Sequence, residues 1–351
     1  MSNPYSGLPD HQFWRRGVAG GEPFLLDPVV ATRFVIGKED RVATAGSCFA
    51  QHIARRLASS GLNYFVAEAG EHLPEPARPE ANYGVFSARF GNIYTTRQLL
   101  QLFEECFEGR ESAEPAWVRG DGRLVDPLRA QVEPAGFASA EEVAGDRARH
   151  LEAVRRMFRE CGVFVFTLGL TEAWRSRLDG TVFSAAPGVP GGTFDPARHE
   201  FVNFGVEEVV SDLCLFLEKL RLINPGVRVL LTVSPVPLIA TYEPRHVLVS
   251  NSASKSTLRV AAEEAWRRFD WVDYFPSYEI ITGNFNDSAY YESDYRGVNA
   301  QGVDHAMRCF MRHYTVDGQR AAATGPADVP RVAAGALDGV VCDEEAIDPD
   351  A

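Results

Sequence analysis

Hydrophobic residues follow two alternating patterns between about residue 41 and residue 315. The first is a short apolar run, and the clearest example is GVFVFTLGL at 162–170, which is typical of a strand buried on both faces of a parallel sheet. Runs of the same kind predict strands at 41–46, 62–68 and 227–235. The second pattern is helical spacing, which predicts helices at 49–60, 95–107, 139–161, 205–223, 254–268 and 299–314.

The order of these elements predicts the fold class and the organisation of the chain. Strands that alternate with helices predict a three-layer α/β domain over 41–315, with a mostly parallel sheet and right-handed crossovers. Segments at about 109–138 and 175–202 lack sustained periodicity and are interpreted as insertions, of which the second could cover a site. Residues 1–40 predict an arm over the body, and 316–351 predict an acidic, disordered or loosely attached tail.

Composition narrows the class of protein. With 351 residues, 45% hydrophobic and 24% charged, the chain resembles an ordinary soluble globular protein in composition. Its formal net charge of −13, without a block of Lys and Arg, argues against a nucleic-acid partner. The N-terminus lacks the apolar core of a signal peptide and no 18-residue apolar run occurs, so we expect neither a signal peptide nor a membrane span.

Cysteine and histidine usage bears on the compartment and on metals. The six cysteines have no short paired spacing such as CxxC, which fits neither a disulfide framework nor a zinc site. We therefore expect a reducing, cytoplasmic setting. Metal binding is not expected, because no cluster of His, Asp and Glu has the spacing of metal ligands.

The most informative chemistry lies at Gly46-Ser47-Cys48, between a predicted strand and a predicted helix. Such a turn directs side chains and free backbone N–H groups to the carboxyl end of a parallel sheet, where open α/β folds bind ligands. Cys48 and Ser47 are therefore candidate nucleophiles. The alternative interpretation is structural: Cys48 as a small buried apolar residue and Ser47 as a helix N-cap.

The pentapeptide GSCFA at 46–50 resembles the naming motif of the GSCFA family, usually grouped with the SGNH/GDSL-type hydrolases. This resemblance implies an SGNH-hydrolase-like fold and a hydrolase-like chemistry. Further segments are similar to the same family in the same order: FGNIYTTRQLLQL at 90–102, FTLGLTEAW at 166–174, LLTVSPVPL at 230–238, HVLVSNSASKSTLR at 246–259 and DYFPSYEI at 273–280.

The resemblance assigns roles around the turn. In that superfamily the nucleophile is the third residue of a Gly-x-Ser turn, a position that Cys48 holds here, so the resemblance favours Cys48 over Ser47. The superfamily takes oxyanion donors from a glycine after the second strand and from an asparagine in a Gly-x-Asn turn after the third. Gly91-Asn92 resembles the first element, while Gly169 is followed by Thr171 in place of the asparagine. The alternative is that Asn92 only shapes a turn and Thr171 only caps a helix.

The general base departs from the superfamily pattern. An Asp-x-x-His sequence before the last helix corresponds here to Asp294-Tyr295-Arg296-Gly297, with glycine where histidine would stand. His305, within the following helix, is expected to be a surface or packing residue. His246 is the candidate replacement, because its loop follows the strand at 227–235 and should lie at the same sheet edge as the turn. An exposed loop histidine without a role is the alternative.

Secondary candidates complete the predicted site. Glu172, Asp294 and Arg296 could orient the base or hold an anionic group, although single charges are more often solvated surface residues. Lys255 is expected to open a helix, where it could contact phosphate of a coenzyme A or nucleotide ligand.

The resemblance, together with these residues, implies two alternative functions. The first is acyl transfer or ester hydrolysis on a small or carbohydrate-linked substrate, through a covalent intermediate on Cys48 or Ser47; no cofactor is required, although an acyl-coenzyme A donor would fit as co-substrate. The second is a non-catalytic binding module in polysaccharide or envelope assembly, which the missing Asp-x-x-His would explain. The sequence does not indicate the oligomeric state.

Overall fold

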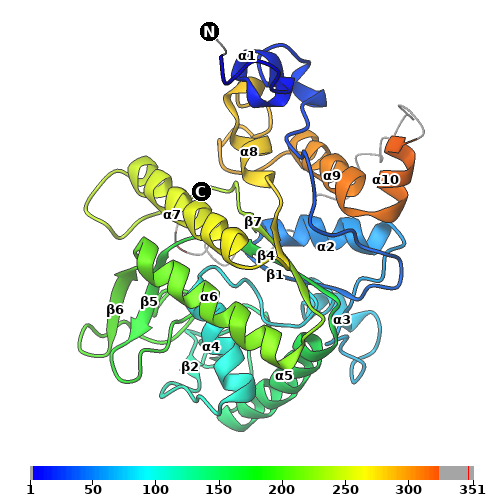
Figure 1. Cartoon of the computed structure of the whole chain (residues 1–351). Coiled ribbons are helices and arrows are strands. Elements are labelled where there is room, and N and C mark those ends of the chain that lie inside the picture. Colours follow the sequence, from blue (N-terminus) through cyan, green and yellow to red (C-terminus); the bar gives the residue numbers. More distant parts are fainter. Residues whose placement is uncertain (1–2, 324–346, 348–351) are drawn as a thin grey trace.

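A parallel four-stranded sheet forms the centre of the molecule (Figure 1). The computed structural model describes residues 3–323 and 347. The strands are β1 (Val42–Gly46), β4 (Val163–Leu168), β7 (Arg228–Val233) and β8 (Val272–Tyr274), in the order β1-β4-β7-β8 and all parallel. The predicted α/β class with a parallel sheet is therefore confirmed.

The predicted strand at 62–68 is wrong except for a single bridge. Tyr64 pairs in parallel with Val42 on the edge of β1 opposite to β4. Beyond this bridge the chain leaves the sheet, because the Ala67 N–H already bonds to the Ser87 carbonyl. After β1 the chain therefore runs along one edge of that strand, at Tyr64, and later returns to place β4 along the opposite edge. Such a reversal of strand order makes the β1–β4 boundary the topological switch point, where open α/β sheets bind ligands.

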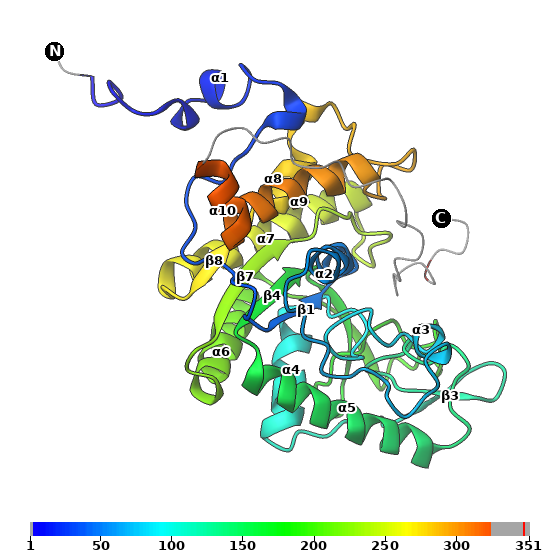
Figure 2. The ribbon, with the colours of Figure 1, turned by 90° about the vertical axis from the view of Figure 1, so that its right-hand side faces the viewer.

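Helices cover both faces of the sheet (Figure 2). Along β4, Val163 and Val165 pack with α2 (Phe49–Ser59) and α9 (Ala300–Tyr314). The intervening Phe164 and Phe166 pack on the opposite face. The helices there are α4 (Thr96–Phe107), α5 (Ala140–Glu160), α6 (Val206–Ile223) and α7 (Val247–Arg268). This alternation follows from the two-residue period of a strand and produces three layers.

Helices α2, α4, α5, α6 and α9 lie within a residue or two of their predicted bounds, but α7 begins at Val247 rather than at 254. The reason is a side-chain cap: His246 Nδ1 accepts a hydrogen bond from the Leu248 N–H, 3.1 Å away. Lys255 therefore lies inside the helix and does not open it. The other helical segments of the described residues are α1 (Trp14–Gly17), α3 (Ala77–Glu80), α8 (Ser277–Thr282), α10 (Val316–Ala323) and 3-10 turns at Asp10–Gln12, Pro23–Leu25 and Asn284–Asn286.

Both predicted insertions contain an antiparallel hairpin. The first holds β2 (Trp117–Val118) and β3 (Leu124–Val125). The second holds β5 (Glu172–Ser176) and β6 (His199–Asn203), and β5 begins three residues before the predicted insertion. Thr171 is thus followed by a strand, so the alternative that it caps a helix is wrong.

The two flanking segments contact the body at defined points. His305 is buried and lies between the Tyr290 hydroxyl and the Leu26 carbonyl, a packing role that ties the N-terminal segment to α9. Residues 316–323, predicted as tail, form α10, because the Thr315 hydroxyl accepts from the Gly318 N–H at the start of the helix. Residues 324–346 and 348–351 lie outside the described residues.

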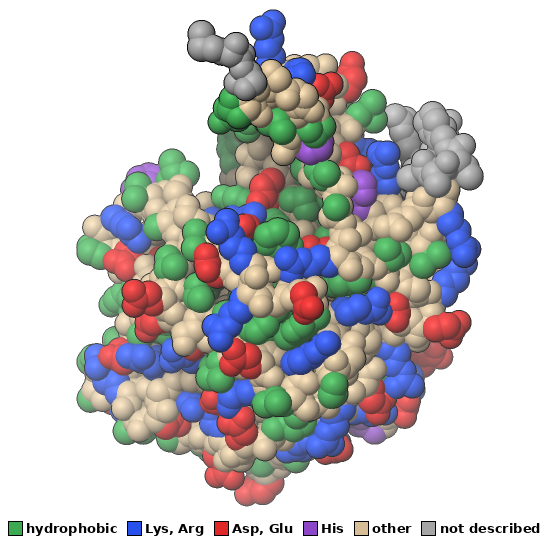
Figure 3. All heavy atoms as spheres, in the orientation of Figure 1, with side chains coloured by type: hydrophobic (Ala, Val, Ile, Leu, Met, Phe, Trp, Pro, Cys, Tyr) green, Lys and Arg blue, Asp and Glu red, His purple; other side chains and the backbone are tan. Residues whose placement is uncertain are grey.

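Surface charge and helix composition bear on the expected partners. On the face in Figure 3, basic and acidic side chains are interspersed. Among the helices of the described residues, none is long and apolar enough to cross a membrane.

Candidate functional site

The turn between β1 and α2 requires glycine at residue 46. Gly46 has φ +130°, and a Cβ built there would lie 2.3 Å from the Thr167 carbonyl oxygen of β4. The contact is with backbone of the neighbouring strand, which has no flexible end to move aside. Gly46 thus allows β1 and β4 to pair up to the last residue of β1.

Ser47 and Cys48 follow at the switch point with their side chains almost completely buried, at 2% and 3% exposure. Cys48 is the N-cap residue of α2 and has helical backbone angles. The Ser47 N–H bonds to the Thr167 carbonyl at 3.1 Å, while its hydroxyl has no hydrogen-bond partner among the described residues. A buried hydroxyl without a partner costs about 1–3 kcal/mol, so such groups mark either a functional site or an ordered water.

Segment 91–94 crosses the ends of β1 and β4. The Gly46 carbonyl accepts from the Ile93 N–H at 2.9 Å, and the Tyr94 carbonyl accepts from the Gly169 N–H at 3.1 Å. Asn92 is buried, and its Oδ1 accepts from Gln51 Nε2 of α2 at 3.4 Å. The structure therefore brings the predicted Gly91-Asn92 and Gly169 together with the nucleophile turn.

Thr171 takes part in a separate polar cluster. Its hydroxyl donates to Asn203 Oδ1 at 2.7 Å and lies 3.1 Å from the Ser254 hydroxyl. The Thr171 N–H also bonds to Ser254 Oγ, at 3.1 Å. Because a hydroxyl carries a single proton, Thr171 donates to an oxyanion only if it releases Asn203.

Lys255 is a residue of α7 whose side chain contacts the backbone just after the end of β4. Its side chain is fully buried, and Nζ donates to the Gly169 carbonyl at 2.7 Å. The predicted contact of Lys255 with phosphate remains a prediction, and the partner of Nζ in the structure is a backbone carbonyl. Lys255 instead fixes the backbone that follows β4, two residues beyond the register partner of Gly46.

The histidines are placed differently from the sequence prediction. His246 is exposed as the N-cap of α7, nine residues and about 13.5 Å along the helix axis from Lys255. Among the described residues, no hydrogen bond joins it to Ser47 or Cys48.

His52 follows Cys48 by four residues in a continuous helical stretch, a spacing that brings Cβ atoms to about 5–6 Å. Burial lowers the pKa of His52 to about 4.

The remaining charged candidates have structural contacts. Asp294 Oδ1 accepts from the backbone N–H groups of Arg296 and Gly297, both at 2.9 Å, and shapes an exposed loop. Tyr291 attaches this loop to the carboxyl edge of the sheet, since its hydroxyl donates to the Pro235 carbonyl at 3.0 Å. Glu172 accepts from the Thr241 hydroxyl at 2.6 Å, and burial raises the pKa of this carboxyl.

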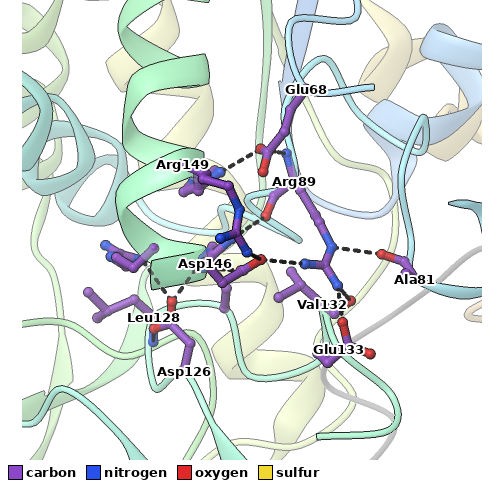
Figure 4. A network of polar contacts seen from close by, with 12 residues as sticks. Glu68, Ala81, Arg89, Asp126, Leu128, Val132, Glu133, Asp146 and Arg149 are labelled. Atoms are coloured by element: carbon purple, nitrogen blue, oxygen red, sulfur yellow. Dashed lines mark hydrogen bonds and ion pairs between the residues drawn. The ribbon is translucent and has the colours of Figure 1, made fainter. Parts of the chain in front are cut away.

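A buried ionic network supports segment 91–94 (Figure 4). Asp146 of α5 bonds to Arg89 at 3.1 Å and to Arg129 at 2.8 Å. Asp126 bonds to Arg129 and Arg147; burial raises its pKa, but Arg147 and Arg129 outweigh burial and lower it to about 2. Arg89, two residues before Gly91, is thereby fixed to α5.

His150 is a buried residue that the sequence did not single out. Its Nδ1 lies 2.7 Å from Glu68 Oε2, and burial lowers the pKa of His150 to about 4, so the neutral ring donates Nδ1–H to the carboxylate. Nε2 has no partner among the described residues. His150 lines a cavity of about 30 Å³ with Asn92 and Arg129, which is large enough for one water molecule. Only its helical position on the buried face of α5 was visible in the sequence.

Comparisons with known proteins give one match. The sequence model of the GSCFA family matches residues 41–310, more than half of the chain. No curated protein and no solved structure matches. Within residues 3–323 and 347, no group of three or more His, Cys, Asp and Glu side chains is placed to hold a metal ion.

Proposed function

The chain belongs to the GSCFA family, and on that premise we propose that it is an SGNH-like acyl-transfer enzyme, an acyltransferase or esterase, with Cys48 as its nucleophile. The observation that carries the proposal is the position of the turn. Gly46 allows a close approach of two strands at the topological switch point, and the thiol follows at the N-terminus of α2. The N-terminus of a helix stabilises negative charge that develops beside it, through the helix dipole and through backbone N–H groups.

The reaction follows from these groups. Cys48 Sγ gives its proton to a base and attacks the carbonyl carbon of an ester or thioester; the C–S bond forms as the carbonyl π electrons move to oxygen. Collapse of this oxyanion breaks the bond to the leaving group, which takes the proton from the base. An acceptor hydroxyl, or water in hydrolysis, then attacks the thioester, and the departing Cys48 sulfur regains a proton. Backbone N–H groups at the start of α2 are the proposed oxyanion donors.

His52 is the proposed base. Its four-residue spacing from Cys48 supports this role, whereas the imidazole of His246 already caps α7 through Nδ1. Burial keeps His52 neutral, so the ring can accept a proton. Its lowered pKa makes it a weak base, so the thiol proton passes to it while the C–S bond forms, because bond formation makes that proton more acidic. Lys255 acts as a positioning residue through the Gly169 carbonyl.

The substrate side of the proposal is a small or carbohydrate-linked acceptor with an ester or an acyl-coenzyme A thioester as donor. A cytoplasmic setting is part of the proposal, because a reducing compartment keeps cysteines as thiols. The five cysteines of the described residues are all free thiols.

One observation favours the rival function, a binding module in polysaccharide or envelope assembly. Among the described residues, no hydrogen bond joins the side chain of Ser47 or Cys48 to a base, and both side chains are nearly inaccessible. A scaffold that only binds would show the same arrangement.

Covalent labelling separates the two functions. We would treat the folded protein with an electrophilic acyl probe and map the adduct by mass spectrometry. Cys161 and Cys309 serve as internal controls, because burial raises the pKa of each thiol to about 12. The enzyme proposal expects an adduct on Cys48, formed faster than with free cysteine and absent from Cys48→Ala. An adduct on Ser47 with Cys48 unmodified would refute the nucleophile assignment, and labelling no faster than free cysteine would leave the binding module.

A further inference from the structure

A pocket of about 220 Å³ lies beside the ends of β4 and β7. Its lining does not include Gly46, Ser47 or Cys48. Its walls come from the β5–β6 hairpin, the loop at 183–186 and the segment at 238–242 after β7. These are the connections at the carboxyl edge of the sheet, where α/β proteins bind small molecules.

The lining of this pocket is chiefly apolar. Trp174, Phe183 and Phe201 contribute aromatic surface, and Leu238 contributes aliphatic surface. Glu172 is the charged residue of the lining, but its two oxygens accept from the Thr241 hydroxyl and the Tyr242 N–H. A ligand in this pocket therefore meets hydrophobic contacts and gains little from charge.

The pocket is adjacent to the nucleophile turn through two backbone links. Tyr94 and Leu170 line it, and the Tyr94 carbonyl accepts from the Leu170 N–H at 3.1 Å. Ile93, next to Tyr94, donates to the Gly46 carbonyl at 2.9 Å. A group held in the pocket thus lies within a few residues of the turn that carries Cys48.

The volume indicates how large a group the pocket can hold. A cavity of about 150 Å³ holds benzene, with its six carbon atoms, so 220 Å³ corresponds to roughly nine non-hydrogen atoms. An unbranched chain of about eight carbons with a polar end group is of this size.

We propose that this pocket binds an apolar acyl chain of about eight carbons, so that the substrate class of the enzyme is a medium-chain acyl ester or thioester. The acyl character of the ligand rests on the proposed function, whereas the preference for a chain of this length rests on the pocket itself.

The test uses ligands that carry no acyl group, so that binding is measured without catalysis. Straight-chain primary alcohols from butanol to decanol are titrated into the full chain by calorimetry. We expect the affinity to rise about fourfold per methylene, the equivalent of about 0.8 kcal/mol, and to stop rising near octanol. Trp174 fluorescence should change during the titration, and Trp174→Phe should lose that signal while it retains binding.

Two substitutions move the length limit in opposite directions. Ala185→Phe fills the pocket and should lower the limit below octanol, whereas Phe201→Ala enlarges it and should extend the limit towards decanol. Ala253→Phe, on the exposed surface of α7, is the matched control and should leave the series unchanged. Because one variant fills and the other enlarges, a folding defect in either leaves the other as the test.

The outcomes separate this inference from the proposed function. Absence of binding, affinity independent of chain length, or an unchanged limit in both pocket variants would overturn the pocket assignment. Chain-length-dependent binding without covalent labelling of Cys48 would support the pocket and contradict the enzyme.

Discussion

Gly46→Ala tests whether the close approach of two strands defines the nucleophile turn. The new Cβ would lie 2.3 Å from the carbonyl oxygen and 2.7 Å from the nitrogen of Thr167, and the residue would keep φ +130°. Backbone strain of this kind costs about 1–3 kcal/mol, and forced overpacking costs a further 1–3 kcal/mol. The free energy of unfolding should therefore fall by about 2–6 kcal/mol.

Gly61→Ala is the matched control for this measurement. Gly61 also has positive φ, +74°, but a Cβ there meets no atom within 4 Å. Its substitution should cost only the conformational penalty of about 1–2 kcal/mol. Urea unfolding of both variants isolates the contact with Thr167, and probe labelling of Cys48 in the folded fraction reports the geometry of the turn. Equal losses of stability in the two variants, within about 0.5 kcal/mol, would refute the close-approach argument.

Three further predictions concern the base, the pH dependence and the ionic network. His52→Gln should lower the Cys48 labelling rate by about 10²–10⁴, whereas His246→Ala should remove a helix cap, cost about 1 kcal/mol and leave the rate unchanged; the reverse result would restore His246 as the base. The pKa of His52 is about 4 in the folded protein and 6.5 in its ordinary state, so between these pH values the unfolded chain binds a proton that the folded protein does not bind. The free energy of unfolding should therefore fall as the pH drops from 6.5 to 4. Urea unfolding at each pH measures this slope, which should be shallower in His52→Gln. Asp146→Ala leaves Arg89 and Arg129 buried without their shared carboxylate, so the free energy of unfolding measured in urea should fall by about 3–5 kcal/mol. The control Asp294→Ala, in an exposed loop, should lower it by about 1 kcal/mol or less. Equal losses of stability in the two variants would show that the network contributes little.

Local patterns were sufficient for most elements and for the turn. The apolar run at 162–170 predicted β4, and helical spacing predicted five helices nearly to their ends, because these signals depend on residues close in the chain. Gly46 between strand and helix was likewise visible as a turn. Its necessity came from Thr167 of another strand, which no local pattern contains.

The strand predicted at 62–68 and the start of α7 show how context overrides pattern. An apolar segment forms a strand only where a neighbouring strand supplies hydrogen-bond partners along its length. Here the segment makes a single bridge at Tyr64, after which the Ala67 N–H donates to the Ser87 carbonyl. Helix α7 gained almost two turns because the His246 ring caps it, a side-chain contact that hydrophobic spacing does not encode.

The sequence by itself determined the fold class, the family and the residues of the nucleophile turn, since each depends on short-range order of residue types. Only the tertiary structure decided which groups surround that turn. Lys255 bonds to the Gly169 carbonyl, and His150 bonds to the Glu68 carboxylate, and each pair is more than 80 residues apart in the sequence. Their burial, their pKa values and the apolar pocket arise from distant segments that pack together, because desolvation and Coulomb interactions depend on distance in space and not on distance along the chain.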